Sequence, residues 1–197
     1  MGEWGSDPEG LVFSNWRKEA FNLQELLSLG YKRRTGSDLG FVDATTIIDS
    51  LYDEAGKRIF VFNEYYATGK QLDEVAAAMA SMELKHQKIY MDAAEPRSID
   101  FFRKKGFNTV GCVKGPDSVR AGISFLQNLE IVVSPNCRHL IEELSNFSYL
   151  KDKKTERYVE DKYTHEWSHA IDGLRYAYSD IYMGKTLKTF DKKLLGI

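Results

Sequence analysis

A chain of 197 residues, 43% of them hydrophobic, is long enough for one substantial domain with a buried core, and a second full domain is not expected. Its 27 basic and 29 acidic residues nearly cancel, so the net charge of −2 neither supports nor excludes nucleic-acid binding, which would need a local patch. No apolar run approaches the roughly 18 residues that span a bilayer, and no signal-peptide pattern is present, so we expect a soluble, intracellular protein.

The first part of the chain, residues 1–30, mixes aromatic and polar residues and is expected to be a lead-in segment that packs on the domain. Only Asn22 to Leu29 has a helical pattern. Three strands are predicted next: one that leads into Asp38, one over Ala44 to Tyr52, and one over Arg58 to Tyr66. The short Gly-containing loop after Tyr52 predicts a hairpin, and thus an antiparallel meander.

The middle of the chain alternates helices and strands. Apolar residues at helical spacing predict a helix over Gln71 to Leu84, and a strand over Lys88 to Asp92 follows. Pro96 is suited to the first turn of a helix that runs to Lys105, with Gly106 as its cap, and Phe107 to Cys112 is the next strand. This order predicts a βαβ unit.

The last part continues the α/β pattern, which sets the fold class. Ser118 to Leu129 and Cys137 to Phe147 are predicted helices on either side of a short strand over Glu130 to Val133. The charged segment Lys151 to Lys162 lacks an apolar period and is expected to be a loop or a solvated hairpin. Trp167 to Met183 is predicted as a helix with a buried stripe formed by Ile171, Leu174, Tyr178 and Ile181.

The cysteines Cys112 and Cys137 are far from any CxxC or zinc-ligand spacing. We expect both to be free thiols in a reducing compartment.

Asp38 stands at the end of a predicted strand, between Gly36 and Gly40. A carboxylate in that place can reach a metal ion, and the glycines leave room for a sharp turn or for a ligand close to the backbone. The alternative is that Asp38 is an ordinary turn residue, because Asp bonds its own backbone in turns.

Two further aspartates are placed in a comparable way, Asp92 at the end of the fourth predicted strand and Asp172 on the last helix. Neighbouring strands of an α/β sheet bring their carboxyl ends together, and a helix across that edge can add a third oxygen ligand. Mg²⁺ or Mn²⁺ held by a few carboxylates is the usual way to build a two-metal site that cleaves phosphodiesters.

His169 lies three residues before Asp172, so the two side chains fall on one helix face. The pattern alone leaves two interpretations open. The pair belongs to the acidic site, or His169 caps a loop while Asp172 pairs with Arg175 in solvent.

Several motifs resemble one known family, the nuclease domain of the large terminase subunit of tailed bacteriophages. They are Gly36-Ser37-Asp38-Leu39-Gly40-Phe41 with Asp43, Glu64-Tyr65-Tyr66, Asp92-Ala93-Ala94-Glu95-Pro96, Lys114-Gly115-Pro116-Asp117-Ser118-Val119 with Ala121-Gly122-Ile123, and His169 to Ala177. The resemblance covers most of residues 31–180. Ala44 departs from it, because the family often has proline there, which affects only the local turn.

The resemblance implies a ribonuclease H-like three-layer α/β fold. Its central mixed sheet, an antiparallel meander of three strands followed by parallel strands, is flanked by helices. The nuclease domain would span 31–184, after the lead-in segment 1–30 and before a C-terminal tail, 185–197. The function implied is that of an endonuclease that cuts concatemeric double-stranded DNA with little sequence specificity during viral genome packaging in the host cytoplasm.

The same resemblance assigns roles to particular residues. Asp38, Asp92 and Asp172 would hold two Mg²⁺ or Mn²⁺ ions and act in catalysis, with His169 as an additional catalytic residue near the metal. Lys114 and Glu95 would be supporting or DNA-contacting groups.

Arg33 and Arg34 are further candidates for contacts with the DNA backbone, as are Lys185, Lys188, Lys192 and Lys193, although short basic runs are often solvated surface. Glu64 is either a further metal ligand or a structural carboxylate.

Full-length members of the family carry an ATPase motor ahead of the nuclease, so its motor domain, the portal protein and the small terminase subunit are the expected partners. No GxxxxGK[ST] phosphate loop occurs in this sequence, and we expect no ATP hydrolysis from it. Two other functions remain open: a different ribonuclease H-like nuclease, such as a junction resolvase, or a docking module that has lost cleavage.

Overall fold

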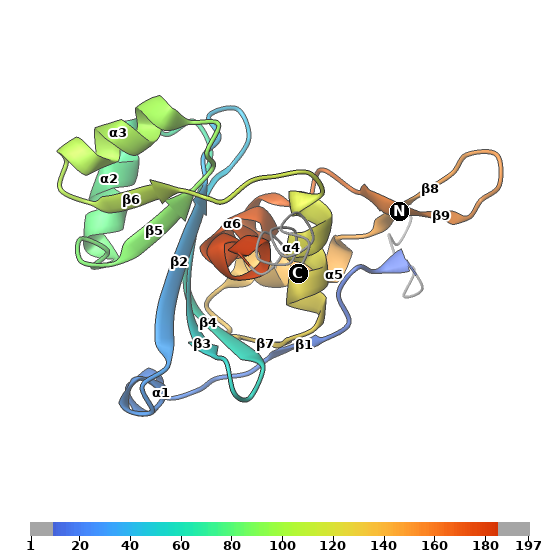
Figure 1. Ribbon diagram of the computed structural model, residues 1–197, viewed down its shortest axis with the longest axis horizontal. Helices are drawn as coiled ribbons and strands as arrows, with labels where there is room; N and C mark the ends of the chain where they lie inside the picture. The colour runs from blue at the N-terminus through green and yellow to red at the C-terminus, as the bar shows by residue number, and fades with distance from the viewer. Residues whose placement is uncertain (1–9, 185–197) are drawn as a thin grey trace, which may run out of the picture.

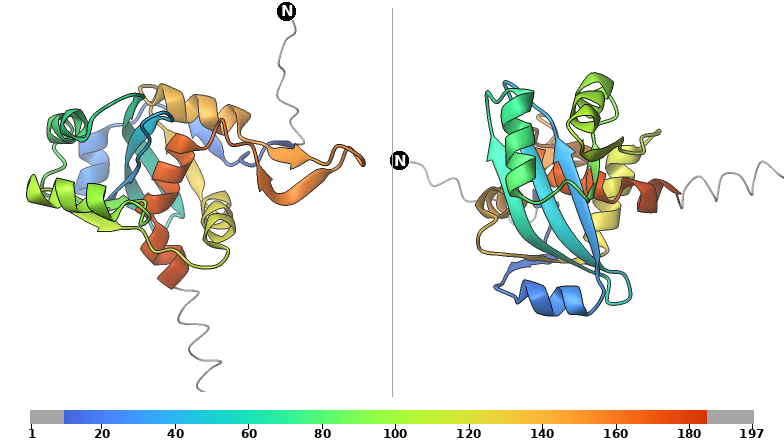
Figure 2. Two further views of the ribbon diagram at one scale, coloured as in Figure 1. Left: turned by 90° about the horizontal axis from the view of Figure 1, so that it is seen from above. Right: turned by 90° about the vertical axis from the view of Figure 1, so that its left-hand side faces the viewer.

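The computed structural model of the protein describes residues 10–184, which form a mixed sheet covered by helices on both faces (Figures 1 and 2). The strands of the sheet are β1 (Trp16–Lys18), β2 (Lys32–Asp38), β3 (Thr45–Asp53), β4 (Arg58–Ala67), β5 (Lys88–Met91), β6 (Asn108–Gly111) and β7 (Glu130–Val133). The helices are α1 (Leu23–Ser28), α2 (Leu72–Ser81), α3 (Pro96–Lys104), α4 (Ser118–Gln127), α5 (Arg138–Asn146) and α6 (His169–Ala177). A separate hairpin is formed by β8 (Tyr149–Lys151) and β9 (Tyr158–Tyr163).

The strand order is β1-β7-β4-β3-β2-β5-β6, with β3 in the middle and buried along its whole length. Strands β2, β3 and β4 pair antiparallel, while β5 and β6 extend the sheet in parallel from β2, and β7 and β1 extend it in parallel from β4. The mixed three-layer arrangement expected from the sequence is therefore confirmed. So are the meander, the βαβ unit around α3 and the hairpin within the charged segment.

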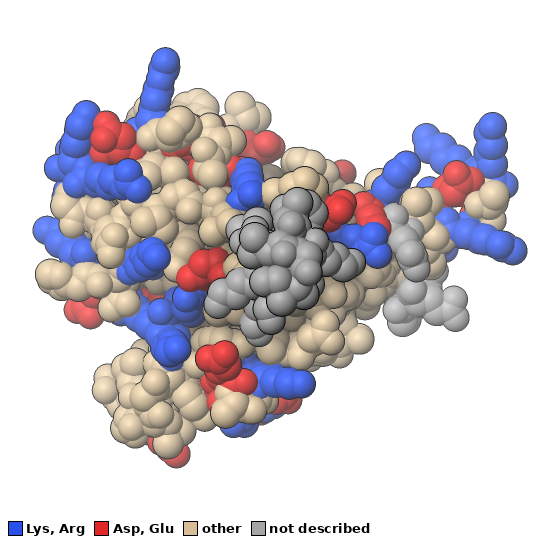
Figure 3. Space-filling view, in the orientation of Figure 1, with Lys and Arg blue, Asp and Glu red and all other residues tan. Residues whose placement is uncertain are grey.

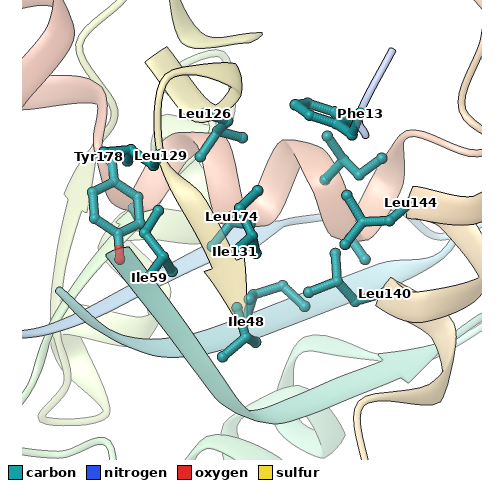
Figure 4. Close-up of a cluster of buried hydrophobic side chains, with 14 of the residues drawn as sticks. Phe13, Ile48, Ile59, Leu126, Leu129, Ile131, Leu140, Leu144, Leu174 and Tyr178 are labelled. Carbon is teal, nitrogen blue, oxygen red and sulfur yellow. The ribbon is translucent and has the colours of Figure 1, made fainter. Parts of the chain in front are cut away.

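The two faces of the sheet have separate cores, because successive residues of β3 point to opposite sides. Ile47 packs with α2 and α3, whereas Ile48 packs with α4, α5 and α6 in the larger cluster (Figure 4). Leu51, on the same face as Ile47, packs with Phe60 of β4 and with residues of α1. Helices α1 to α3 thus cover one face and α4 to α6 the other.

Local signals account for most helix boundaries. Asn22 caps α1 by accepting from the amides of Gln24 and Glu25, and Pro96 occupies the first turn of α3. Gly106 follows α3 with a φ of +88°, the left-handed conformation that ends many helices.

Two elements differ from the sequence-based prediction. Strand β1, within the segment expected to be a lead-in, pairs with β7 at the edge of the sheet, and nearby Phe13 is fully buried in the larger core. The last helix is not continuous, since α6 ends at Ala177, Tyr178 adopts a turn, and helical structure resumes over 179–184. The fully buried Tyr178 ring sits at this break, with its hydroxyl 2.9 Å from that of Ser50.

Cys112 and Cys137 are buried free thiols, as expected. No helix within residues 10–184 has both the length and the apolar character to span a bilayer. The tail 185–197, with the lysines proposed there, lies outside the described residues.

Candidate functional site

Asp38 and Asp92 leave the sheet at the same edge. Asp38 is the last residue of β2, and Asp92 is the first residue after β5. These strands are parallel neighbours with Ser37 opposite Met91, and neighbouring strands lie about 4.8 Å apart. The two carboxylates therefore start from adjacent positions on one edge.

Asp172 reaches this edge because α6 packs unusually close to β2. A Cβ atom added to Gly36 would lie 2.0 Å from the carbonyl oxygen of Gly173 and 2.6 Å from the amide nitrogen of Ala177. The Thr46 hydroxyl also donates to the carbonyl of His169 over 2.9 Å. Gly36 was expected to make room for a turn or a ligand, but the structure shows that it makes room for a helix.

Tyr176 of α6 contacts one of the three aspartates directly. Its hydroxyl donates to Oδ2 of Asp92 over 3.1 Å. Burial raises the pKa of Tyr176 far above its usual value, and the charges of Asp172, Asp38 and Asp92 all add to this shift. Tyr176 was not predicted from the sequence as a site residue, although it lies one helical turn after Asp172, at the i+4 position that shares a face with it.

Asp172 is held by a buried arginine. Two nitrogens of Arg175 donate to Oδ1 of Asp172 over 3.0 and 2.7 Å, and only 5% of the Arg175 side chain is exposed. Burial raises the pKa of Asp172, and the charge of Asp38 raises it further, while Arg175 opposes the shift. The pairing considered in the sequence analysis exists, but it is not in solvent, because α4 covers the arginine at Gly122.

Asp92 is held by a more exposed cation. The Lys114 ammonium pairs with Oδ1 of Asp92, and the same oxygen accepts from the amide of Ala94 over 2.7 Å. Burial of Asp92 opposes ionisation, but the hydrogen bonds from Lys114 and Ala94 outweigh it, so the pKa of Asp92 is lowered. Lys114 thus lies directly beside one of the three carboxylates.

His169 faces the same cluster. Its Nδ1 lies 3.6 Å from Oδ2 of Asp38, and interaction with that carboxylate raises the pKa of His169 above its ordinary 6.5, against the effect of burial. His169 thus lies beside Asp38, as the first interpretation expects, while the Asp172–Arg175 pair of the second interpretation is also present.

Glu143 is a further carboxylate that sequence reasoning missed. From α5 it accepts hydrogen bonds at Oε2 from the amides of Ala170 and Ile171, the first turn of α6, over 2.8 and 3.0 Å. Burial raises its pKa to about 7. A signal was present, because Glu143 lies on the apolar stripe of α5 between Leu140 and Leu144, where a charged residue needs a partner.

The other candidates lie farther from the cluster or have structural contacts. Arg33, about 17 Å from Asp38 along β2, pairs with buried Asp49 and donates to the carbonyl of Met82. The Arg34 guanidinium donates to the carbonyl of Ala177 and pairs with Asp180, which fastens α6 to β2. Neither side chain is brought to the three aspartates.

The two glutamates considered from the sequence, Glu64 and Glu95, both make hydrogen bonds within the protein. Glu64 accepts from the amides of His139 and Leu140 over 2.9 and 3.0 Å, so it caps α5, in agreement with its structural interpretation. Glu95 accepts from the Ser98 hydroxyl over 3.3 Å and lines a hollow of about 260 Å³ beside Gly40.

The donor chemistry of the cluster suits a hard divalent ion, because all three aspartates offer carboxylate oxygens. Asp38 and Asp172 each have one oxygen that no group within residues 10–184 hydrogen-bonds or pairs with. As the side chains stand, no three His, Cys, Asp or Glu groups in that range converge on a single point. Lys114 and Arg175 hold two of the three carboxylates instead.

A protein-family profile and two phage terminase subunits match most of this chain. The profile of the family described as "Terminase RNAseH like domain" matches residues 38–180. The PBSX phage terminase large subunit of Bacillus subtilis is 29% identical over 163 residues, 82% of this chain and 37% of the relative. The terminase large subunit of Bacillus phage SPP1 is 32% identical over 152 residues, 74% of this chain and 35% of the relative. The chain therefore spans about a third of the length of these relatives.

Solved structures agree with the sequence matches. The crystal structure of the SPP1 large terminase nuclease domain with bound Mn superposes with a TM-score of 0.77 at 27% identity, covering 85% of this chain and 97% of that one. The P22 large terminase nuclease domain superposes with a TM-score of 0.66 at 14% identity and covers 86% and 91% of the two chains, which supports the fold alone.

Proposed function

This chain belongs to the terminase RNase H-like domain family, and on that premise we propose that it is a divalent-metal-dependent endonuclease that cuts double-stranded DNA during viral genome packaging. The observation that supports the proposal is that Asp38 and Asp92 lie at the ends of neighbouring parallel strands, while α6, which carries Asp172, packs against β2 at Gly36. The Mn bound in the related SPP1 nuclease domain supports the choice of ion.

The three aspartates would hold two Mg²⁺ or Mn²⁺ ions. When bound, such ions activate water and neutralise charge on the phosphate that is attacked. Asp38 and Asp172 each offer a carboxylate oxygen that the described residues leave free, and Arg175 fixes the other oxygen of Asp172. The protein thereby orients its ligands before any substrate arrives.

Two further residues act beside the carboxylates. His169, 3.6 Å from Asp38, holds that side chain in place and carries positive charge over a wider pH range than an isolated histidine. Lys114 supplies an ammonium group at the rim of the site that can meet a DNA phosphate. Phosphate contacts of this kind position a duplex without reading bases, so sequence specificity should be slight.

In the whole protein, an ATPase motor domain, the portal protein and the small terminase subunit would be the partners, in the host cytoplasm. This chain would not hydrolyse ATP by itself, since no GxxxxGK[ST] sequence occurs in it.

The test is cleavage of a supercoiled plasmid with Mn²⁺ or Mg²⁺, compared with the same reaction in chelator. The variants Asp38→Asn, Asp92→Asn and Asp172→Asn keep side-chain shape but remove a charged ligand, and each should slow cutting by at least about 100-fold. Asp100→Asn, on the exposed face of α3, is the matched control and should cut at the normal rate.

Normal cutting by all three site variants would show that the assignment is wrong. A strong preference for a four-way junction over linear duplex would favour a junction resolvase. Absence of Mn²⁺ binding in calorimetry would favour a docking module.

A further inference from the structure

The two cations in the acidic cluster differ in how firmly they are held. Arg175 makes two hydrogen bonds to Asp172, is 5% exposed, and is enclosed by α4, where a Cβ on Gly122 would lie 2.4 Å from its side chain. The Lys114 side chain is 40% exposed and reaches Asp92 by a single ammonium group. One cation is fixed, and the other is able to leave.

Both oxygens of Asp92 accept hydrogen bonds while Lys114 is in place. Its Oδ1 accepts from Lys114 and from the Ala94 amide, and its Oδ2 accepts from the Tyr176 hydroxyl. A divalent ion that binds Asp92 at Oδ1 must displace Lys114 or the Ala94 amide, because a carboxylate oxygen has about two lone-pair sites. The Ala94 amide belongs to the turn at the end of β5, and Tyr176 is 5% exposed and packed in the core, so neither can move without displacing backbone or buried side chains.

Lys114 has room to move and stays close when it does. It lies in the connection between β6 and α4, which runs past α6 (Figure 1), and 40% of its side chain is exposed. Lysine has a flexible four-carbon stem and a strongly hydrated ammonium, so releasing it to solvent is inexpensive. After release, its ammonium remains within reach of any phosphate that the cluster binds.

We propose that Lys114 is an exchangeable counter-ion: it holds Asp92 in the metal-free protein, yields Asp92 to the incoming divalent ion, and then turns to a phosphate of the DNA. This proposal rests on the proposed function and adds the order of events at its site. It assigns Lys114 two successive partners, where a simple DNA-contacting lysine would have one.

Calorimetric titration of the full 197-residue chain with MnCl₂ tests the exchange. In Lys114→Ala, Mn²⁺ no longer competes with an ion pair for Asp92, and its affinity should rise roughly three- to tenfold. Lys104→Ala is the matched control, because Lys104 makes a surface pair with Asp100 on α3, 2.7 Å long and away from the cluster. Its Mn²⁺ affinity should equal that of the wild type.

Removing the positive charge of Lys114 could by itself raise Mn²⁺ affinity, without any movement of Lys114. Crystals of the wild-type chain, grown in chelator and in Mn²⁺, show directly whether Lys114 leaves Asp92. We expect Lys114 on Asp92 in the first crystal and away from it in the second. Lys114 still paired with Asp92 in the manganese crystal, or equal Mn²⁺ affinities for wild type and Lys114→Ala, would overturn the exchange while leaving the nuclease assignment intact. If the wild type bound no Mn²⁺ at all, the proposed function would fail, and the exchange with it.

Discussion

Glu143 shows how one buried residue outside the acidic cluster supports the residues within it. Its carboxylate accepts from the first amides of α6, where the helix dipole favours negative charge, and the next residues along are Asp172 and Gly173. His169, on the same turn, adds a favourable positive charge. Burial nevertheless raises the pKa of Glu143 to about 7, so this support changes with pH.

The sign of that change follows from proton binding. Between about pH 4.5 and 7 the folded protein keeps a proton on Glu143 that the unfolded chain has released, so the free energy of unfolding falls as pH rises. In Glu143→Gln this contribution is absent. The difference in unfolding free energy, wild type minus variant, should fall by at most about 3 kcal/mol over that range and stay level above it.

Urea unfolding of the two proteins at a series of pH values measures this difference. His169 titrates in both proteins, so its contribution cancels to first order. Glu142→Gln, an exposed neighbour on α5, is the control and should run parallel to the wild type. A Glu143→Gln curve that also runs parallel would contradict the raised pKa.

At the scale of elements, the contact between β2 and α6 decides the geometry of the site. Two contacts join these elements directly: the close approach at Gly36 and the hydrogen bond from Arg34 to the carbonyl of Ala177. Thr46 of the neighbouring strand β3 adds a hydrogen bond to the carbonyl of His169. Because Asp38 is on the strand and Asp172 on the helix, the separation of the two elements sets the separation of the carboxylates.

Gly36→Ala tests this dependence. The added methyl group would meet backbone atoms of α6 at 2.0 and 2.6 Å, so the helix must shift, at a cost of about 1–3 kcal/mol in unfolding free energy. Mn²⁺ affinity should fall as well, because Asp172 moves with the helix. Urea unfolding and calorimetry give the two quantities.

Gly184→Ala is the matched control for this variant, since a Cβ there has no neighbouring atom of residues 10–184 within 4 Å. It should leave both quantities unchanged. Normal stability and normal Mn²⁺ affinity in Gly36→Ala would show that the close approach of α6 does not set the site.

At the scale of the whole molecule, the net charge of −2 conceals an uneven distribution of charge. The hairpin of β8 and β9 projects from the body with lysine and arginine side chains at its tip (Figure 3). The Asp152 carboxylate accepts from the amides of Lys154 and Thr155 within the turn, which leaves Lys153, Lys154 and Arg157 exposed. The hairpin leads into the first turn of α6, the end of the helix that carries His169 and Asp172.

We predict that the hairpin tip contacts the phosphate backbone of DNA. Replacing Lys153, Lys154 and Arg157 together by glutamine should weaken duplex binding equally for unrelated sequences. It should also lower the slope of log affinity against log salt by up to about three, since roughly one counterion is released per contact. Fluorescence anisotropy over a range of salt concentrations measures both effects.

The control replaces three exposed lysines elsewhere, Lys57, Lys85 and Lys104, by glutamine, with the same change in net charge. Equal losses of affinity in the two triple variants would mean that only net charge matters, and the hairpin contact would be rejected. Mn²⁺ affinity should be unaffected in both.

The sequence by itself determined the kind and order of the elements. β-Branched and aromatic runs predicted β3 and β4, Asn22 and Pro96 marked helix starts, and the three aspartates were identified with the strand ends and the helix that carry them. These signals are local, because each depends on neighbours along the chain. Strand β1 was not predicted from the sequence. Its three residues form a strand because the edge of β7 offers hydrogen-bond partners, which the local sequence does not reveal.

Only the tertiary structure decided how the site is assembled. The pairing of Ser37 with Met91, the approach of α6 to Gly36, and the cap that Glu143 places on α6 join residues that are far apart in sequence. The ion pair between Lys114 and Asp92 also joins residues far apart in sequence. Arg175, which the sequence pattern would place in solvent, is buried in the folded protein. Spacing along a chain reports which residues share a strand or a helix face, whereas the distance between two elements depends on how their side chains and glycines pack.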